Sequence, residues 1–244
     1  WGTRRVPTGL FVKNKGISKS TARAVWNHFN TPDYPWEQRF KRFPTGHYNN
    51  TRFGPYVGDE QQAAFKRDYP AVHAMVHEAT AAMNEHIAQF EPDSSFKRFK
   101  PESVNVHKHE PGWGLGAHYD DSHDEGMGIV LMITVCDPDA DNPVPREFLF
   151  TDPVGGYQYS VRTPDGNCVV FKDACYDFWR HESIRNKKQT GTALSFTVRL
   201  KSVDGYQNVR NDQKYSRGAP AAEKTAHRRM REQGMARAPG VDMC

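Results

Sequence analysis

Residues 193–201 read ALSFTVRLK, in which every second side chain is large and apolar. Successive side chains of a strand point to opposite faces, so this pattern predicts a strand with one face buried. Seven further segments after residue 100 share this period of two and are separated by Gly, Pro or Asp turns. They lie near residues 103–109, 116–120, 128–135, 147–151, 156–161, 168–172 and 178–184. Eight short strands at this spacing predict a double-stranded β-helix, or jelly roll, over about residues 100–201.

Two helical patterns precede these strands. The clearer one runs from about Pro70 to Ile87, where apolar residues recur three and four positions apart and Pro70 suits a first turn. The other begins after Ser18, and a short strand is expected before it at residues 10–14. The sequence therefore predicts an α+β fold, mostly β with flanking helices, whose jelly-roll core is buttressed by the N-terminal helices.

The distribution of residue types divides the chain into a body and a tail. The chain has 244 residues, 37% of them hydrophobic, which is enough for a sizeable core, and we expect a single domain over residues 1–204. Residues 31–60 combine many aromatic rings with Pro, Gly and Asn, which indicates a substrate lid. Residues 205–244 hold eight Lys and Arg against four Asp and Glu, which accounts for the net charge of +4. We expect this basic tail to be flexible and able to contact a phosphate backbone.

Composition also bears on location. No stretch approaches the ~20 uninterrupted apolar residues of a membrane-spanning helix, and the mean hydropathy is −0.80. The four cysteines lie far apart without a C-x-x-C pair, which fits neither a disulfide framework nor a cysteine zinc site. We therefore expect no membrane partner and a reducing, intracellular location, cytoplasmic or nuclear.

A candidate metal site lies in the β region. In the expected strand 116–120, the period of two sends the side chains of His118 and Asp120 to the same face, where both can bind one ion. His181 is the natural third ligand, because it follows an apolar run and lies in an expected strand flanked by aromatic residues. Two histidines and a carboxylate on one face leave coordination positions open, as in non-haem Fe(II) oxygenases.

Three stretches of the β region share their order and spacing with one known family. They are HEPG (109–112) leading to HYDD (118–121), NCVVFKDACYDFWRHESI (167–184) and ALSFTVR (193–199). Together they resemble the AlkB-type branch of the 2-oxoglutarate and Fe(II)-dependent dioxygenases. A weaker match, TGHYNNTRFGPYV (45–57), falls where that family has its nucleotide-recognition lid. The resemblance spans roughly residues 8–201.

This resemblance implies an enzyme that uses Fe(II), 2-oxoglutarate and O₂ to hydroxylate a C–H bond. The metal ligands would be His118, Asp120 and His181. The typical substrates of the branch are methylated or otherwise alkylated nucleobases in nucleic acid, DNA or RNA, and the hydroxylated methyl group leaves as formaldehyde. Some relatives act on proteins.

The chain departs from the family pattern at the expected co-substrate contacts. On its last strand the branch has two arginines six residues apart, of which the first pairs with the distal carboxylate of 2-oxoglutarate. Arg199 fits the second position, but Ala193 occupies the first. An Asn and a Tyr that also hold the co-substrate are replaced by His107 and His109.

A cation from elsewhere is therefore needed if 2-oxoglutarate is bound, because alanine cannot anchor a carboxylate. Arg199, Arg185 or Lys201 would supply it after a local shift, with His107 and His109 donating hydrogen bonds. Alternatively, the protein uses a different co-substrate or has reduced activity.

Three further residues are candidate substrate contacts. The family's lid position falls on Arg52, which with nearby rings would clamp a base taken out of its helix. Asp121 follows a metal ligand and is expected near the mouth of the site. Alternation turns Tyr119 away from the metal face, so packing in the opposite layer is its alternative role. The alternative to base binding for Trp36, Phe40 and Phe53 is a structural role in which they cover the end of the barrel.

Other interpretations of the function of these residues remain open. The same chemistry on a protein or a small molecule fits the charge-balanced body equally well. A cupin-like metal site would instead use His107, His109 and Glu110 as ligands, but it leaves His181 unexplained. A catalytically silent binding module would account for Ala193.

Overall fold

The structure is a computed structural model. It describes residues 6–32, 34, 36, 47–53, 59–91, 98–120, 128–140, 145–152, 156–184 and 191–203. The expected tail at residues 205–244 therefore lies outside the described residues, as does most of the expected lid at residues 31–60.

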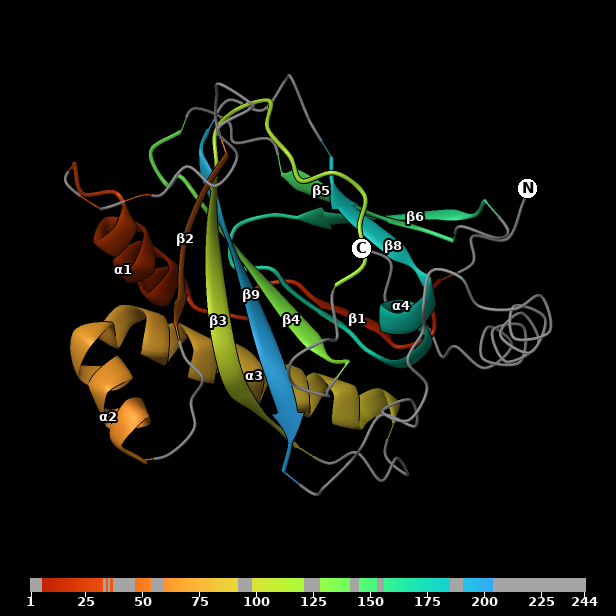
Figure 1. Cartoon of the computed structure of the whole chain (residues 1–244), viewed down its shortest axis with the longest axis horizontal. Helices are drawn as coiled ribbons and strands as arrows, with labels where there is room; N and C mark the ends of the chain where they lie inside the picture. Colours follow the sequence, from red (N-terminus) through yellow and green to blue (C-terminus); the bar gives the residue numbers. More distant parts are fainter. Residues whose placement is uncertain are drawn as a thin grey trace.

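Two antiparallel sheets form the body of the protein (Figure 1). The six-stranded sheet has the order β1 (Leu10–Lys13), β7 (Cys168–Phe171), β4 (Val130–Cys136), β9 (Ala193–Ser202), β3 (Phe99–His109) and β2 (His47–Phe53). The three-stranded sheet has the order β6 (Gln158–Thr163), β5 (Arg146–Thr151) and β8 (Arg180–Ser183). Strands that are distant in sequence are neighbours in both sheets, as the jelly-roll prediction requires.

Helices cover one face of the six-stranded sheet (Figure 1). The long helix α3 (Pro70–Phe90) and α1 (Lys19–Phe29) bury their apolar stripes against it, while α2 (Asp59–Asp68) packs on α3. Ser18 caps α1 as expected, because its hydroxyl accepts a hydrogen bond from the Thr21 amide. Glu78 on α3 also accepts from the Ser18 amide, at 2.6 Å. The two expected helices are thus confirmed and fixed to each other at this end.

The alternation in residues 193–201 separates two cores. Leu194, Phe196, Val198 and Leu200 pack in the core shared with the helices. The alternate residues of β9 face the space between the two sheets. There a second core joins strands β4 and β7 to the small sheet, with Phe148, Phe150 and Phe171 among its members. The space between the sheets is therefore apolar at β7 and becomes polar towards β9 and β3.

The structure corrects several expected elements. Residues 116–120 form no strand; they contribute an isolated bridge between His118 and His181. Within the segment expected to be an irregular lid, residues 47–53 form strand β2 at the edge of the large sheet. A short helix, α4 (Asp173–Phe178), separates β7 from β8. None of the described helices combines the length and apolarity needed to cross a membrane.

Candidate metal site

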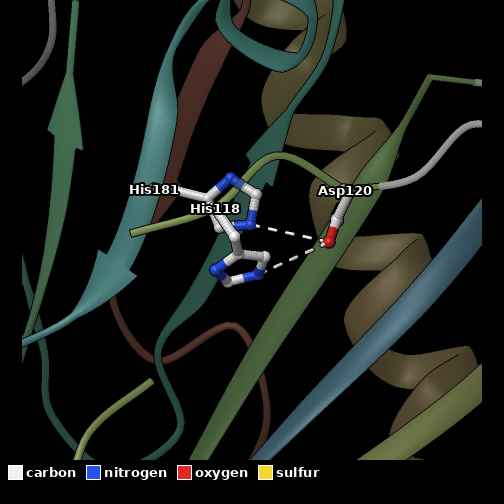
Figure 2. A group of neighbouring side chains, drawn as sticks. All are labelled: His118, Asp120 and His181. Atoms are coloured by element: carbon white, nitrogen blue, oxygen red, sulfur yellow. Dashed lines mark ion pairs between the residues drawn. The ribbon is translucent and has the colours of Figure 1, made fainter. Parts of the chain in front are cut away.

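Three side chains converge between the sheets: His118, Asp120 and His181 (Figure 2). The Nε2 atoms of His118 and His181 lie 3.7 Å and 3.6 Å from Oδ1 of Asp120. One ligand atom from each residue lies within 4.8 Å of the others. Among the described residues this is the one group of three or more His, Cys, Asp or Glu side chains with such spacing. The three residues selected from the sequence are therefore brought together.

The backbone around His118 and His181 explains this convergence. The His118 amide donates to the His181 carbonyl at 3.0 Å, and the His181 amide donates back at 2.9 Å. This bridge extends the edge of the small sheet at β8 by a single residue pair. His118 and Asp120 were expected on one face of a strand; instead, the bridge positions His118, and Asp120 follows it without strand pairing.

Both imidazoles have defined surroundings. The carbonyl of Gly116 lies 2.8 Å from Nδ1 of His118, which favours the tautomer with a proton on Nδ1 and a lone pair on Nε2. His181 is buried, and the rings of Phe148, Phe150 and Phe171 surround it at centroid distances of 5.6, 6.3 and 4.9 Å. This packing directs Nε2 of His181 towards Asp120.

The electrostatics of the site favour an ionised carboxylate at Asp120. Burial alone would raise the pKa of Asp120, but the hydrogen bond and charge of His181, together with Arg199, outweigh it and lower the pKa to about 2. Burial, and then the proximity of His181, lower the pKa of His118 below its ordinary 6.5. The carboxylate of Asp120 is thus ionised and available as a ligand at neutral pH, and burial favours the neutral form of His118 beside it.

This donor set fits a divalent transition metal. Two imidazoles and one carboxylate on one side of an ion form the facial triad of non-haem Fe(II) sites and leave positions open for other ligands. Imidazole also binds zinc and other divalent ions. The three donors therefore indicate a transition-metal site that is compatible with several divalent metals.

Arg199 and Tyr176 surround the outer side of the carboxylate. Nη1 of Arg199 lies 3.2 Å from Oδ2 of Asp120 and donates to the Tyr176 hydroxyl at 3.3 Å. Arg199 was selected from the sequence as a co-substrate contact, and the structure places it against a metal-ligand candidate. Tyr176, on α4, was missed as a site residue, because only the folding of α4 over the site brings its hydroxyl there.

His107 and His109 lie on the same strand, β3, away from the three converging side chains. In register they face Ser195 and Ala193 on β9, whereas Arg199 pairs with Ser103 farther along. His109 is buried, and the two imidazoles are 6.1 Å apart between centroids. Within the described part of the chain, they do not form a metal cluster with Glu110, so the cupin-like grouping is not observed.

The remaining residues predicted for the site or its surroundings differ in exposure and in whether the structure describes them. Tyr119 is 44% exposed, so the alternative of packing in a buried layer is wrong. Lys201 is exposed and lies 3.6 Å from Glu102. Asp121, Arg185 and the side chain of Arg52 lie outside the described residues. Trp36 packs on the helical core against Phe29, with centroids 5.6 Å apart, while Phe40 and the side chain of Phe53 lie outside the described residues.

Comparisons with known proteins identify the fold. No family model and no curated protein sequence matches the chain. Among solved structures, OsALKBH1 is 14% identical, with a TM-score of 0.53 over 80% of this chain and 99% of its own. A Pseudomonas putida prolyl-4-hydroxylase is 13% identical, with a TM-score of 0.48 over 80% of this chain and 94% of its own. An oxidoreductase of the 2OG-Fe(II) oxygenase family from Burkholderia pseudomallei is also 13% identical, with a TM-score of 0.48 over 78% and 84%.

The fold and the site together define a class of protein: a jelly roll with two histidines and a carboxylate converging between its sheets. More particularly, the fold matches that of OsALKBH1 over 80% of this chain and 99% of OsALKBH1. The predicted fold class is thereby confirmed.

Proposed function

We propose that this protein is an Fe(II)- and 2-oxoglutarate-dependent dioxygenase of the AlkB type that hydroxylates a methylated or otherwise modified nucleobase in nucleic acid. The observation that carries the proposal is the convergence of His118, Asp120 and His181 inside a jelly roll. The motifs around these residues are those that resemble the AlkB branch.

Each side chain of the site has a defined task in this proposal. His118, Asp120 and His181 would hold the metal, since Nε2 of each histidine faces Oδ1 of Asp120. When bound, Fe(II) with 2-oxoglutarate supplies the activation of O₂ that hydroxylates a C–H bond. Arg199 contacts Oδ2 of Asp120, which would leave Oδ1 available as the metal ligand. The phenylalanine rings around His181 exclude water from the buried side of the site.

The surface beside the site supports a nucleic acid substrate. Tyr119, between two metal-ligand candidates in sequence, is 44% exposed, and an exposed ring can stack on a base. Arg180, exposed on β8, donates to the Ala117 carbonyl at 2.8 Å, and its charge acts on the Tyr119 hydroxyl. An aromatic ring and a cation side by side are the elements that bind a base and its phosphate.

The first test is an anaerobic Fe(II) titration with and without 2-oxoglutarate, followed by absorption spectroscopy. We expect the weak visible band of a chelated Fe(II)–2-oxoacid complex in the wild type and not in Asp120→Asn. Asp139→Asn, which changes an exposed carboxylate, is the matched control and should keep the band. Absence of the band from metal-loaded wild type would contradict 2-oxoglutarate use.

The second test addresses the substrate. Single-stranded DNA and RNA oligonucleotides carrying N-methylated bases are incubated with the loaded enzyme, and formaldehyde and demethylated base are measured. Stoichiometric release of both supports the proposal. Turnover of 2-oxoglutarate with peptide or small-molecule substrates, and not with any methylated oligonucleotide, would overturn the nucleobase assignment while retaining the dioxygenase.

A further inference from the structure

A buried guanidinium, that of Arg146, lies between the sheets near the metal site. Arg146 is the first residue of β5 and is only 3% exposed. By alternation it shares a face with Phe148 and Phe150, whose rings contact His181. Arg146 was not among the residues predicted for the site, although its period-two spacing from the two phenylalanines indicates an inward arginine.

Two hydrogen bonds hold the guanidinium over β8. Its Nη2 donates to the Ser183 hydroxyl at 2.7 Å and to the Trp113 carbonyl at 2.6 Å. Ser183 is two residues beyond His181 on β8 and therefore on the same face. Two residues of a strand span about 7 Å. The guanidinium is thus bonded to a residue whose backbone lies about 7 Å along β8 from that of His181.

The guanidinium also lies across from the position where the family pattern has its first arginine. Its charge acts on the buried thiol of Cys136, on β4. Cys136 pairs with Ala193 on β9, and Ala193 pairs in turn with His109 on β3. Arg146, on the small sheet, therefore lies near the Cys136–Ala193 pair of the large sheet. At this pair the large sheet has alanine where the family pattern has an arginine.

We propose that Arg146 binds the distal carboxylate of 2-oxoglutarate, in place of the arginine that the family pattern has at the position of Ala193. This assignment rests on the proposed function. A guanidinium has five N–H donors and binds carboxylates in a bidentate fashion. The Ser183 hydroxyl, already bonded to Arg146, adds a donor for the same carboxylate. Burial lowers the pKa of Arg146 to about 10, which leaves it charged at neutral pH.

The other cations considered for this role are placed differently. Arg199 lies against Asp120, and Lys201 is exposed beside Glu102. Of the cations whose side chains the structure describes, Arg146 combines burial between the sheets with a position on the His181 face.

The test compares two ligands that differ at one end. 2-Oxovalerate has the chain and oxoacid group of 2-oxoglutarate but a methyl group instead of the distal carboxylate. Binding of both to Mn(II)-loaded protein is measured by calorimetry, which requires no turnover. We expect wild type to prefer 2-oxoglutarate by roughly 10- to 150-fold, the range for a charged hydrogen-bonded contact.

Arg146→Gln should lose this preference and keep its affinity for Mn(II) and for 2-oxovalerate. Arg162→Gln, an exposed arginine on β6, is the matched control and should behave as wild type. The double variant Arg146→Gln with Ala193→Arg should regain preference for 2-oxoglutarate, because it restores a cation from the opposite sheet. If Arg146→Gln does not fold, Arg146→Lys is measured instead; we expect a preference reduced about tenfold, because the planar fork is lost.

The outcomes separate the two proposals. Mn(II) binding by wild type without 2-oxoglutarate binding contradicts the proposed function, and the role of Arg146 falls with it. A preference for 2-oxoglutarate that is unchanged in Arg146→Gln, or in Arg146→Lys, overturns the role of Arg146 alone and leaves the proposed function intact.

Discussion

Nη1 of Arg199 lies 3.2 Å from Oδ2 of Asp120, while Oδ1 of the same carboxylate faces the two imidazoles. The two oxygens of one side chain are thus divided between a fixed cation on the protein and the position of a metal. Arg199 acts on the site through Asp120, and it helps to lower the pKa of that carboxyl to about 2.

Arg199→Gln should therefore weaken metal binding without removing a ligand. We expect the affinity for Mn(II) to fall roughly 10- to 100-fold, the usual effect of losing a residue that orients a metal ligand. Calorimetric titration measures it. A loss of 2-oxoglutarate affinity with unchanged Mn(II) affinity would instead make Arg199 a direct co-substrate contact.

Asp120→Asn should abolish measurable Mn(II) binding, because it replaces the anionic donor with a neutral one and leaves Arg199 without its carboxylate partner. The thermal unfolding temperature of the metal-free variant shows whether the fold persists. Asp139→Asn, on the exposed Arg23 ion pair, is the control. Tight Mn(II) binding by Asp120→Asn would exclude Asp120 as a ligand.

Metal affinity should depend on pH in a defined window. Burial and the neighbouring His181 hold the pKa of His118 below 6.5, so its neutral, metal-binding form persists below that pH. Because this pKa is depressed, any stability that neutral His118 contributes is present above 6.5 and is lost as pH falls through the folded-state pKa. We expect constant Mn(II) affinity between about pH 7 and pH 8 and a decline at lower pH. A tenfold change in Mn(II) affinity between about pH 7 and pH 8 would contradict a His118 pKa below 6.5.

The buried cysteines should resist alkylation in the folded protein. Burial raises the pKa of both Cys136 and Cys168 to about 12, so almost no thiolate is present at pH 8. Iodoacetamide treatment followed by mass spectrometry should label neither until denaturant is added. Rapid labelling of either thiol in the native protein would show that its strand opens readily.

The contact between α3 and the start of α1 should contribute to stability. Glu78 accepts from the Ser18 amide and from the Thr21 hydroxyl, so it acts as a cap supplied by another helix. Glu78→Ala should lower the free energy of unfolding by about 1–2 kcal/mol, the range for a lost cap. Chemical denaturation measures this change, and Glu85→Ala on the same helix is the comparison.

The fold was accessible from the sequence because several strands, such as β5 and β9, have a period of two and others, such as β4 and β7, are short apolar runs. Residues 193–201 show the period of two most clearly, and their apolar half does pack against the helices. Helix α2 was missed because its sequence, DEQQAAFKRD, has few apolar residues and no stripe. Strand β2 was missed because its polar residues lie at a sheet edge and include no apolar alternation.

The candidate metal ligands were also accessible, although one reason given for them was wrong. Strand periodicity was expected to align His118 with Asp120, yet the segment has a single bridge. Tyr176 and Arg146 could not be placed in the site without knowing how α4 and the small sheet fold over it. Local patterns predict which face a residue occupies, but not which residue of another sheet stands opposite.

The reciprocal backbone hydrogen bonds between His118 and His181 have a consequence for assembly of the centre. Two of the three candidate ligands are held together by backbone hydrogen bonds, so they are already positioned before a metal ion binds. Much of the ordering entropy is lost during folding, before the ion arrives. A chelator should accordingly empty this centre and leave a folded protein ready to be reloaded, unlike small domains that unfold when their metal is withdrawn.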